Sequence, residues 1–260
     1  AIAGHFIVTY TEDASDHAYI YDYDGNRIQE VKLPSLGSVG FSGNKDDDEI
    51  FYTFSSYIHP ASIYRYDIKS NESTLYLAPE LKFNPEDYTV DQQFFASKDG
   101  TQIPIFLIHR KDLVKDGKNP VLLYGYGGFN ISLTPSFSTS RIPFIENGGI
   151  YAVVNLRGGG EYGEEWHIAG TKMQKQNVFD DFIAAAEYMI TEQYTSVGNI
   201  AIMGGSNGGL LVGAVVNQRP DLYTVAIPQV GVMDMLKYHK FTIGWNWAPD
   251  YGTSEDSEEM

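Results

Sequence analysis

A serine within a glycine-rich turn is the residue of this sequence with the clearest chemistry. Gly204-Gly205-Ser206-Asn207-Gly208 fits the pattern G-x-S-x-G, with an apolar run before it and a helix-forming run after it. A serine on a sharp strand-to-helix turn is the nucleophile elbow of α/β-hydrolases. The alternative is a turn that binds phosphate at a helix N-terminus, and it is disfavoured because no lysine follows in the P-loop position. We therefore predict that Ser206 is a catalytic nucleophile.

A serine nucleophile needs hydrogen-bond donors for the oxyanion that forms during acyl transfer. Elbow geometry makes the backbone amide of the next residue, Asn207, one donor, and a second donor comes from a loop after an earlier strand. Residues 124–129, Tyr-Gly-Tyr-Gly-Gly-Phe, follow such an apolar run. Their glycines would let the backbone approach a substrate closely, although a plain tight turn is the alternative.

The sequence contains no convincing base or acid for Ser206. Hydrolases of this fold place both after the nucleophile, in the order Ser, Asp, His. His239 is the only histidine after Ser206, and it comes early and between basic neighbours, so we expect a surface or packing residue. Asp221 and Asp234 also follow the serine too closely. Because the chain begins without Met, we expect a fragment or a processed chain.

The elements that would position these residues are of the α/β type. Short apolar runs at 101–108, 120–124 and 149–155 are typical of buried, mostly parallel strands. Together with the elbow and the helices, they predict a doubly wound α/β-hydrolase sheet, which we assign to residues 81–260 as a partial peptidase domain.

A long helix is predicted to begin near Asn177. Its apolar residues at 179, 182, 183, 186 and 190 would form one buried face. Asp180 and Asp181 would then lie in its first turn, where negative charge suits the helix dipole.

Residues 1–80 have a different pattern, with short alternating strands separated by turns. The segment Ile20-Tyr21-Asp22-Tyr23-Asp24 returns as Ile63-Tyr64-Arg65-Tyr66-Asp67, and residues 6–10 have a counterpart at 50–54. A four-stranded unit that repeats at about 40 to 50 residues is typical of a β-propeller blade. We predict about two blades from the C-terminal portion of a propeller; an ordinary antiparallel meander is the alternative.

Composition and charge exclude several classes of protein. The net charge of −16 disfavours nucleic acid or an anionic membrane as partner. The absence of cysteine excludes disulfides and a thiolate nucleophile, and it favours a cytoplasmic location. The sequence contains no run of about 18 apolar residues, so it predicts no membrane-spanning helix. Acidic residues concentrate at 46–49 and 250–259, where we expect solvated loop and terminal charge.

Five segments together resemble the prolyl oligopeptidase family. They are Tyr-Gly-Tyr-Gly-Gly-Phe-Asn at 124–130, Asn-Leu-Arg-Gly-Gly-Gly-Glu-Tyr-Gly at 155–163, Gly-Gly-Ser-Asn-Gly-Gly-Leu-Leu at 204–211, Asn-Gln-Arg-Pro-Asp-Leu at 217–222 and Gln-Val-Gly-Val-Met-Asp-Met at 229–235. The resemblance covers nearly the whole chain. It implies a propeller lid over an α/β-hydrolase domain, cleavage of short peptides after proline, and no metal or organic cofactor.

The resemblance also implies roles for individual residues. Ser206 would be the nucleophile, and the Tyr126 hydroxyl and the Asn207 amide would form the oxyanion hole. Trp247 would stack on the proline ring, with Phe129, Val232 and Tyr251 lining the same pocket; core packing is the alternative for these four.

Other implications concern what this chain lacks or changes. The catalytic Asp and His would lie beyond Met260, in the remainder of the same enzyme. Trp245-Asn246 departs from the family pattern and adds an indole. The segment 157–161 could shape the site or be a structural loop.

Three functions follow from these observations. The leading one is a serine endopeptidase that forms an acyl-enzyme on Ser206 and releases it to water or, in ligation or cyclisation, to an amine. The second is an esterase or lipase on the same fold, which the propeller-like repeat disfavours. The third is a non-catalytic fragment or scaffold piece.

Overall fold

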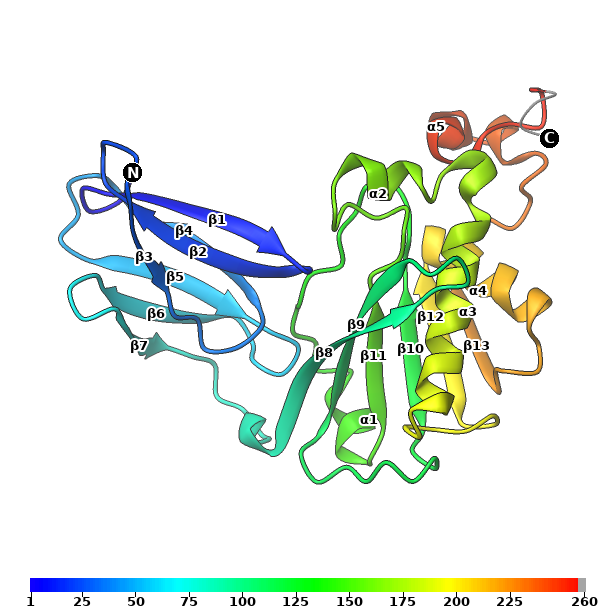
Figure 1. Ribbon diagram of the computed structural model, residues 1–260, viewed down its shortest axis with the longest axis horizontal. Helices are drawn as coiled ribbons and strands as arrows, with labels where there is room; N and C mark the ends of the chain where they lie inside the picture. The colour runs from blue at the N-terminus through cyan, green and yellow to red at the C-terminus, as the bar shows by residue number, and fades with distance from the viewer. Residues whose placement is uncertain (257–260) are drawn as a thin grey trace. The chain divides into compact units, whose positions relative to one another are not determined.

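The computed structural model describes residues 1–256, which form two compact units (Figure 1). Unit 1 comprises Ala1–Val90 and Thr134–Ile142, and unit 2 comprises Asp91–Leu133 and the residues from Pro143 onward. The domain boundary after residue 80 stays a prediction.

Unit 1 contains two consecutive antiparallel sheets, as the blade repeat predicts. The first pairs β1 (Phe6–Glu12), β2 (Ser15–Tyr21) and β3 (Arg27–Val31). The second pairs β4 (Ser38–Ser42), β5 (Ile50–Ser55), β6 (Ser62–Asp67) and β7 (Glu72–Leu77). The two copies of the sequence repeat fall on the pairs β1–β2 and β5–β6, so each copy forms the same antiparallel hairpin.

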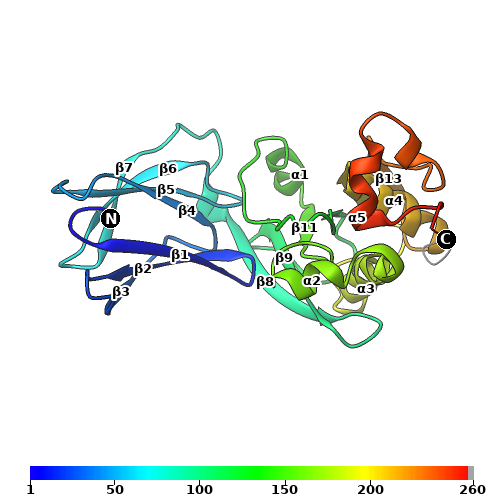
Figure 2. The same cartoon turned by 90° about the horizontal axis from the view of Figure 1, so that it is seen from above.

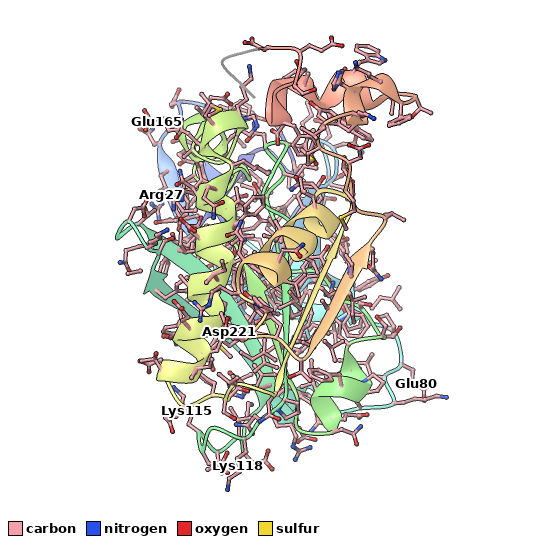
Figure 3. All side chains as sticks on the ribbon, turned by 90° about the vertical axis from the view of Figure 1, so that its right-hand side faces the viewer. Arg27, Glu80, Lys115, Lys118, Glu165 and Asp221 are labelled. Atoms are coloured by element: carbon pink, nitrogen blue, oxygen red, sulfur yellow. The ribbon has the colours of Figure 1, made fainter. Side chains whose placement is uncertain are left out.

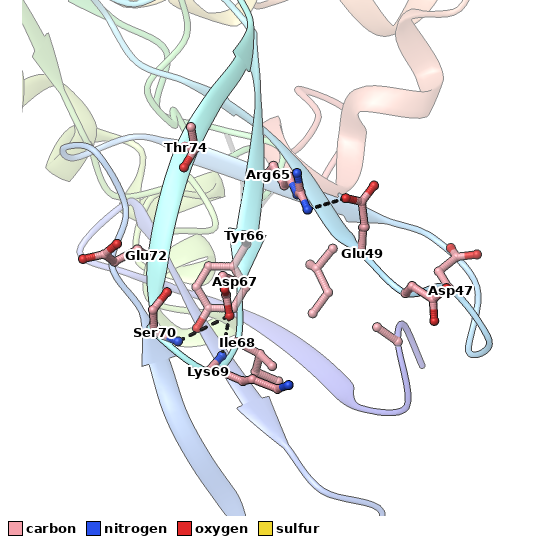
Figure 4. A pocket seen from close by; sticks show the side chains of 13 residues that line it. Asp47, Glu49, Arg65, Tyr66, Asp67, Ile68, Lys69, Ser70, Glu72 and Thr74 are labelled. Carbon is pink, nitrogen blue, oxygen red and sulfur yellow. Dashed lines mark hydrogen bonds and ion pairs between the residues drawn. The ribbon is translucent and has the colours of Figure 1, made fainter.

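Unit 1 has its own apolar core and a charged pocket. Ile20, Tyr52, Phe54 and Tyr66 are buried in the core. The pocket, of about 610 Å³, is lined mostly by polar and charged side chains (Figure 4). Arg65 in this lining pairs with Glu49 at 2.6 Å, and carboxylates outnumber cations among the lining residues. Residues 46–49 are exposed, as expected for solvated loop charge.

Unit 2 is built on a six-stranded mixed sheet of order β13-β12-β10-β11-β9-β8. Strands β11, β10, β12 and β13 are parallel, and β9 is antiparallel to β11. The strands are β8 (Tyr88–Ala96), β9 (Gln102–Arg110), β10 (Val121–Gly125), β11 (Ile150–Val154), β12 (Ile200–Gly205) and β13 (Val225–Gln229). The chain order reverses at β10, which separates β11 from β12, and this is the switch point of a doubly wound sheet.

Helices lie on both faces of this sheet. The long helices α3 (Gln176–Thr191) and α4 (Asn207–Gln218) pack against each other on one face, and α1 (Ile142–Glu146) lies on the other (Figure 2). Short helices complete the unit: α2 (Glu164–Ile168), α5 (Ala248–Tyr251) and the 3₁₀ turns η2 (Lys172–Gln174), η3 (Tyr238–Lys240) and η4 (Gly244–Trp247). A further 3₁₀ turn, η1 (Pro85–Asp87), belongs to unit 1. Charged residues such as Lys115, Lys118 and Glu165 are exposed at the periphery (Figure 3).

The buried face of α3 overlaps the predicted one, with Phe182 and Ala186 buried as expected, but it is shifted by about one residue. The buried side chains are Val178, Asp181, Phe182, Ala185, Ala186 and Met189, whereas Phe179, Ile183 and Ile190 lie at the margin. The helix begins at Gln176, so its first turn holds no acidic residue. Asp181 is completely buried, because Arg157 meets it inside the unit, and the dipole argument does not apply to it.

Across residues 1–256, no helix combines the length and apolarity that crossing a bilayer requires. The acidic tail is also partly different from expectation. Asp250 is only 3% exposed and accepts hydrogen bonds, so it is not solvated terminal charge. Residues 257–259 of that tail lie outside the described residues.

Candidate active site

The elbow places Ser206 between β12 and α4 in a strained backbone conformation. Ser206 has φ 55° and ψ −116°, and its side chain is exposed. Any Cβ at Gly204 would collide with the Gly208 carbonyl, and one at Gly208 would collide with the Gly125 carbonyl. The two glycines of the motif therefore let β12, α4 and the end of β10 meet closely enough to present the serine.

Parallel pairing of β10 with β12 brings Tyr126 beside Ser206. The register pairs Tyr124 with Met203, so the residues after each strand emerge side by side at the carboxyl edge of the sheet. Burial raises the pKa of the Tyr126 phenol, and a hydrogen bond with the Ser206 hydroxyl opposes that rise. The phenol stays protonated at neutral pH and can donate a hydrogen bond, as its predicted oxyanion role requires.

Asn207 connects the elbow to the loop that carries Tyr126. Its side chain is buried, and its Nδ2 donates to the Tyr126 carbonyl at 2.5 Å. Its Oδ1 accepts from Lys175 Nζ at 3.1 Å and from the Tyr251 hydroxyl at 3.0 Å. Gly128 leaves room for this amide, since a Cβ there would lie 2.6 Å from Asn207 Nδ2. The structure thus brings together Ser206, Tyr126 and Asn207.

Three of the four predicted pocket residues belong to one aromatic cluster. Phe129 meets Tyr251 edge-on at 5.2 Å, and Tyr251 meets Tyr238 edge-on at 5.4 Å. Tyr238 stacks on Trp247 at 6.3 Å with an interplanar angle of 15°. Tyr238, which the sequence analysis did not identify, is buried and joins Trp247 to the other two rings.

Val232 and Trp245 both lie in the part of the chain that follows β13. Val232 is half-buried in the segment after β13, and its place in a pocket stays a prediction. Trp245, the indole that departs from the family pattern, is 66% exposed, so its ring faces solvent in the described part of the chain.

A buried charge cluster that the sequence analysis missed lies behind Asn207. Lys175 Nζ donates to the Gly127 carbonyl at 2.8 Å and lies 3.8 Å from Asp250 Oδ2. Asp250 Oδ1 accepts from the Phe129 N–H at 3.1 Å and lies 2.8 Å from His167 Nε2. No local pattern announces these residues, because they come from three separate segments and meet only in the folded chain.

The segment 157–161 is a structural loop that braces the site. Arg157 pairs with Asp181, and the buried Glu161 accepts from the Leu133 N–H and from Asn155 Nδ2. Gly158 to Gly163 also match G-x-G-x-x-G, but Cβ atoms on Gly158 and Gly160 would meet the backbone of residues 127–130. These glycines therefore allow the segment 158–163 to pack closely against the loop after β10.

The histidines of residues 1–256 have their hydrogen bonds and ion pairs away from Ser206. His167 contacts Asp250 and Glu164, and His239 is buried beside Glu255 and Tyr238, so it is a packing residue as expected. In the same part of the chain, no three His, Asp or Glu side chains are arranged to hold a metal ion. The absence of a cofactor stays a prediction.

Known families match both units. Residues 1–79 match the N-terminal β-propeller domain of prolyl oligopeptidase, and residues 135–260 match the prolyl oligopeptidase family. The chain is 55% identical over 258 residues to a prolyl endopeptidase of Elizabethkingia meningoseptica, covering 99% of this chain and 37% of the relative. It is 46% identical to a prolyl endopeptidase of Dictyostelium discoideum, covering 98% of this chain and 34% of the relative. The chain thus spans a little over one third of these relatives.

Solved structures agree with this assignment. A prolyl endopeptidase studied for inter-domain dynamics in catalysis superposes with a TM-score of 0.91 at 47% identity, covering 99% of this chain and 38% of that one. The apo form of prolyl oligopeptidase B from Galerina marginata gives 0.91 at 36% identity, over 99% of this chain and 37% of that one. The chain therefore belongs to the prolyl oligopeptidase family, with propeller strands in unit 1 and most of an α/β-hydrolase sheet in unit 2.

Proposed function

We propose that this chain carries the nucleophile and the proline pocket of a serine endopeptidase that cleaves short peptides on the carboxyl side of proline. The observation that carries the proposal is the strained, exposed Ser206 on its elbow with the Tyr126 phenol beside it. We further propose that a segment outside this chain supplies the base and the acid. The complete enzyme below means this chain together with that segment.

In the first half of the reaction, Ser206 Oγ attacks the carbonyl carbon of the proline residue while the supplied base takes the hydroxyl proton. The carbonyl oxygen becomes an oxyanion that accepts hydrogen bonds from the Tyr126 hydroxyl and the Asn207 amide. The protonated base then gives its proton to the leaving amine as the C–N bond breaks. This leaves an acyl-enzyme on Ser206 and a free amino terminus on the released peptide.

In the second half, water attacks the acyl-enzyme and gives a proton to the base. The C–Oγ bond then breaks, the base returns the proton to Ser206 Oγ, and the peptide ending in proline is released. An amine that attacks in place of water would instead form a new peptide bond, giving ligation or cyclisation. One relative, 38% identical to this chain, is a dual function macrocyclase-peptidase of Galerina marginata, which supports keeping this second outcome.

The aromatic cluster supports proline as the recognised residue. A rigid, apolar ring can lie against an indole without requiring polar partners. Trp247 is half-buried and fixed by its stacking on Tyr238, and Phe129 and Tyr251 are tied to the same ring. We propose that Trp247, Phe129, Val232 and Tyr251 line this pocket.

The cellular setting is part of the proposal. Short proline-containing peptides are the proposed substrates in the cytoplasm, in keeping with the absence of cysteine. The charge of −16 supports a protein that binds neither nucleic acid nor an anionic membrane.

The proposal is tested with the complete enzyme and two short peptides that differ only by Pro or Ala before the cleaved bond. We expect cleavage of the Pro peptide, loss of turnover by at least about 10⁴-fold in Ser206→Ala, and no loss in the exposed control Ser140→Ala. Undiminished cleavage by Ser206→Ala contradicts the nucleophile. Equal turnover of the Ala peptide contradicts the proline specificity, and preference for simple esters favours an esterase.

A further inference from the structure

We propose that Lys175 is a positioning residue that sets the distance between the two halves of the oxyanion hole behind Ser206. The inference rests on the proposed function, because it concerns donors whose catalytic role belongs to that proposal. Lys175 itself lies behind these donors and acts through Asn207 and Gly127.

The two proposed donors come from loops that are far apart in the sequence. The Asn207 amide lies at the start of α4, and the Tyr126 phenol lies in the loop after β10. Lys175 Nζ contacts both loops at once, at 2.8 Å from the Gly127 carbonyl and 3.1 Å from Asn207 Oδ1. Asn207 Nδ2 closes the arrangement by donating to the Tyr126 carbonyl at 2.5 Å. One ammonium group therefore connects the loop that carries Tyr126 to the Asn207 side chain at the start of α4.

Such a connection matters because oxyanion stabilisation depends on preorganised donors. A misplacement of about 1 Å can reduce a rate by about 10²-fold. Asn207 Oδ1 receives one hydrogen bond from a cation and one from the Tyr251 hydroxyl. Bonds with an ionised donor are about twice as strong as neutral ones. The contact with Lys175 is thus the stronger constraint on the Asn207 side chain.

The surroundings of Lys175 argue against a lysine retained only for packing. Its side chain is 12% exposed, and burial lowers the pKa of its ammonium to about 8, although Asp250 opposes this. An apolar side chain would avoid the cost of burying that charge. Its nearest carboxylate, Asp250, lies at 3.8 Å, beyond hydrogen-bond distance, and its donors are directed at the two loops.

The titratable groups around Lys175 are few. Asp250 and Tyr251 face it from α5, with the Tyr251 ring centroid 5.5 Å from Nζ. His167 lies behind Asp250, and Tyr126 belongs to the loop that Lys175 holds. Burial strongly raises the pKa of Tyr251 and raises that of Tyr126, so both phenols stay neutral near pH 8. Loss of the Lys175 proton is the change we expect to weaken the connection above that pH.

The test compares Lys175→Met and Lys175→Arg with the matched control Lys172→Met, an exposed lysine in the neighbouring η2 turn. In the complete enzyme, we expect Lys175→Met to lower kcat by roughly 10- to 100-fold. We expect KM to change by less than about 3-fold, because the contacts that bind the substrate before the reaction are retained. Lys172→Met keeps the wild-type kcat. Because burial lowers the pKa of Lys175 to about 8, we expect the wild-type kcat to decline above about pH 8. We expect Lys175→Arg to move that decline to higher pH, because arginine stays protonated.

Two results overturn the inference. One is a wild-type kcat in Lys175→Met, and the other is an alkaline decline that is the same in the wild type and Lys175→Arg. The pH profile decides the matter even where Lys175→Met fails to fold. Cleavage that does not depend on Ser206 is a separate result, seen in Ser206→Ala, and it removes the proposed function together with this inference.

Discussion

Two buried charge clusters meet α3, and they differ in how completely their hydrogen bonds are made. At Arg157, Nη2 lies 2.6 Å from Asp181 Oδ1, Nη1 lies 2.5 Å from Asp99 Oδ2, and Nε also donates to Asp181. At Lys175, the carboxylate of Asp250 lies 3.8 Å away, and Asp250 Oδ2 has no hydrogen-bond partner among the described residues. The first cluster is saturated and the second is not.

The difference indicates that the two clusters have different structural roles. Arg157 ties the loop after β11 to α3 and to Asp99, all within the frame of the sheet. Lys175 and Asp250 direct their polar atoms at the backbone of Gly127 and Phe129, in the loop that carries one of the two candidate donors, Tyr126. We infer that the saturated cluster mainly stabilises the fold, whereas the unsaturated one holds the loop of Tyr126 in place and contributes less to stability.

The largest loss of unfolding free energy in either cluster is expected from Arg157→Met. It leaves Asp181 completely buried without its counter-ion, and removing one partner of such a pair costs about 3–5 kcal/mol. The matched control is Arg219→Met, whose ion pairs with Glu187 and Asp221 are solvent-exposed, and it should cost at most about 1 kcal/mol. Urea denaturation of the complete enzyme measures both, and equal losses would contradict a special role for burial.

A smaller effect is expected from Asp250→Asn. The variant keeps an acceptor for the Phe129 N–H but removes the negative charge facing Lys175, so we expect a loss of about 1–3 kcal/mol in unfolding free energy. We also expect a higher KM for proline peptides, because Phe129 loses a charged acceptor.

Asp116→Asn is the control for this change, since Asp116 pairs with Lys118 at 3.6 Å in an exposed turn. Urea denaturation and steady-state kinetics check both variants. If Asp250→Asn lowers the unfolding free energy no more than Asp116→Asn does, the Lys175–Asp250 cluster contributes no more to stability than an ion pair at the surface.

The smallest effect concerns Asp99 at the rim of the saturated cluster. Burial acts to raise its pKa, but hydrogen bonds from Arg157 and Thr101 outweigh it and lower the pKa to about 2 from 3.8. A lowered pKa stabilises the fold above the unfolded value, and this stabilisation is lost as the pH falls from about 4 to 2.

Because Asp99 is about half exposed, Asp99→Asn should cost at most about 1 kcal/mol at pH 7. The difference from the wild type should vanish near pH 2 in acid unfolding curves. A difference that persists at pH 2 would show that Asp99 acts through packing and not through its charge.

Local patterns predicted the elbow, the loop after β10 and the parallel strands, because each depends on neighbouring residues. The G-x-S-x-G motif needs glycine at 204 and 208 because a Cβ at either position would collide with a neighbouring backbone carbonyl. The blade repeat likewise predicted that residues 6–10 and 50–54 form equivalent strands, β1 and β5.

The charge clusters could not be predicted because their members are distant in the sequence. Asp250 sits among acidic residues and was expected to be solvated, yet it is buried because α5 brings it to Phe129 and His167. Asp181 was expected to serve the helix dipole, and a shift of one residue in the helix face instead turned it toward Arg157. Apolar periodicity does not reveal such pairs, since it assigns charged residues to solvent.

Covalent labelling of Ser206 tests the central claim most directly. The complete enzyme is treated with a fluorophosphonate probe, and the labelled residue is identified by peptide mass spectrometry. We predict one adduct, on Ser206, that forms at a rate reduced by Lys175→Met and is absent from Ser206→Ala. An unlabelled Ser206 in an enzyme that still cleaves proline peptides would contradict its assignment as the nucleophile.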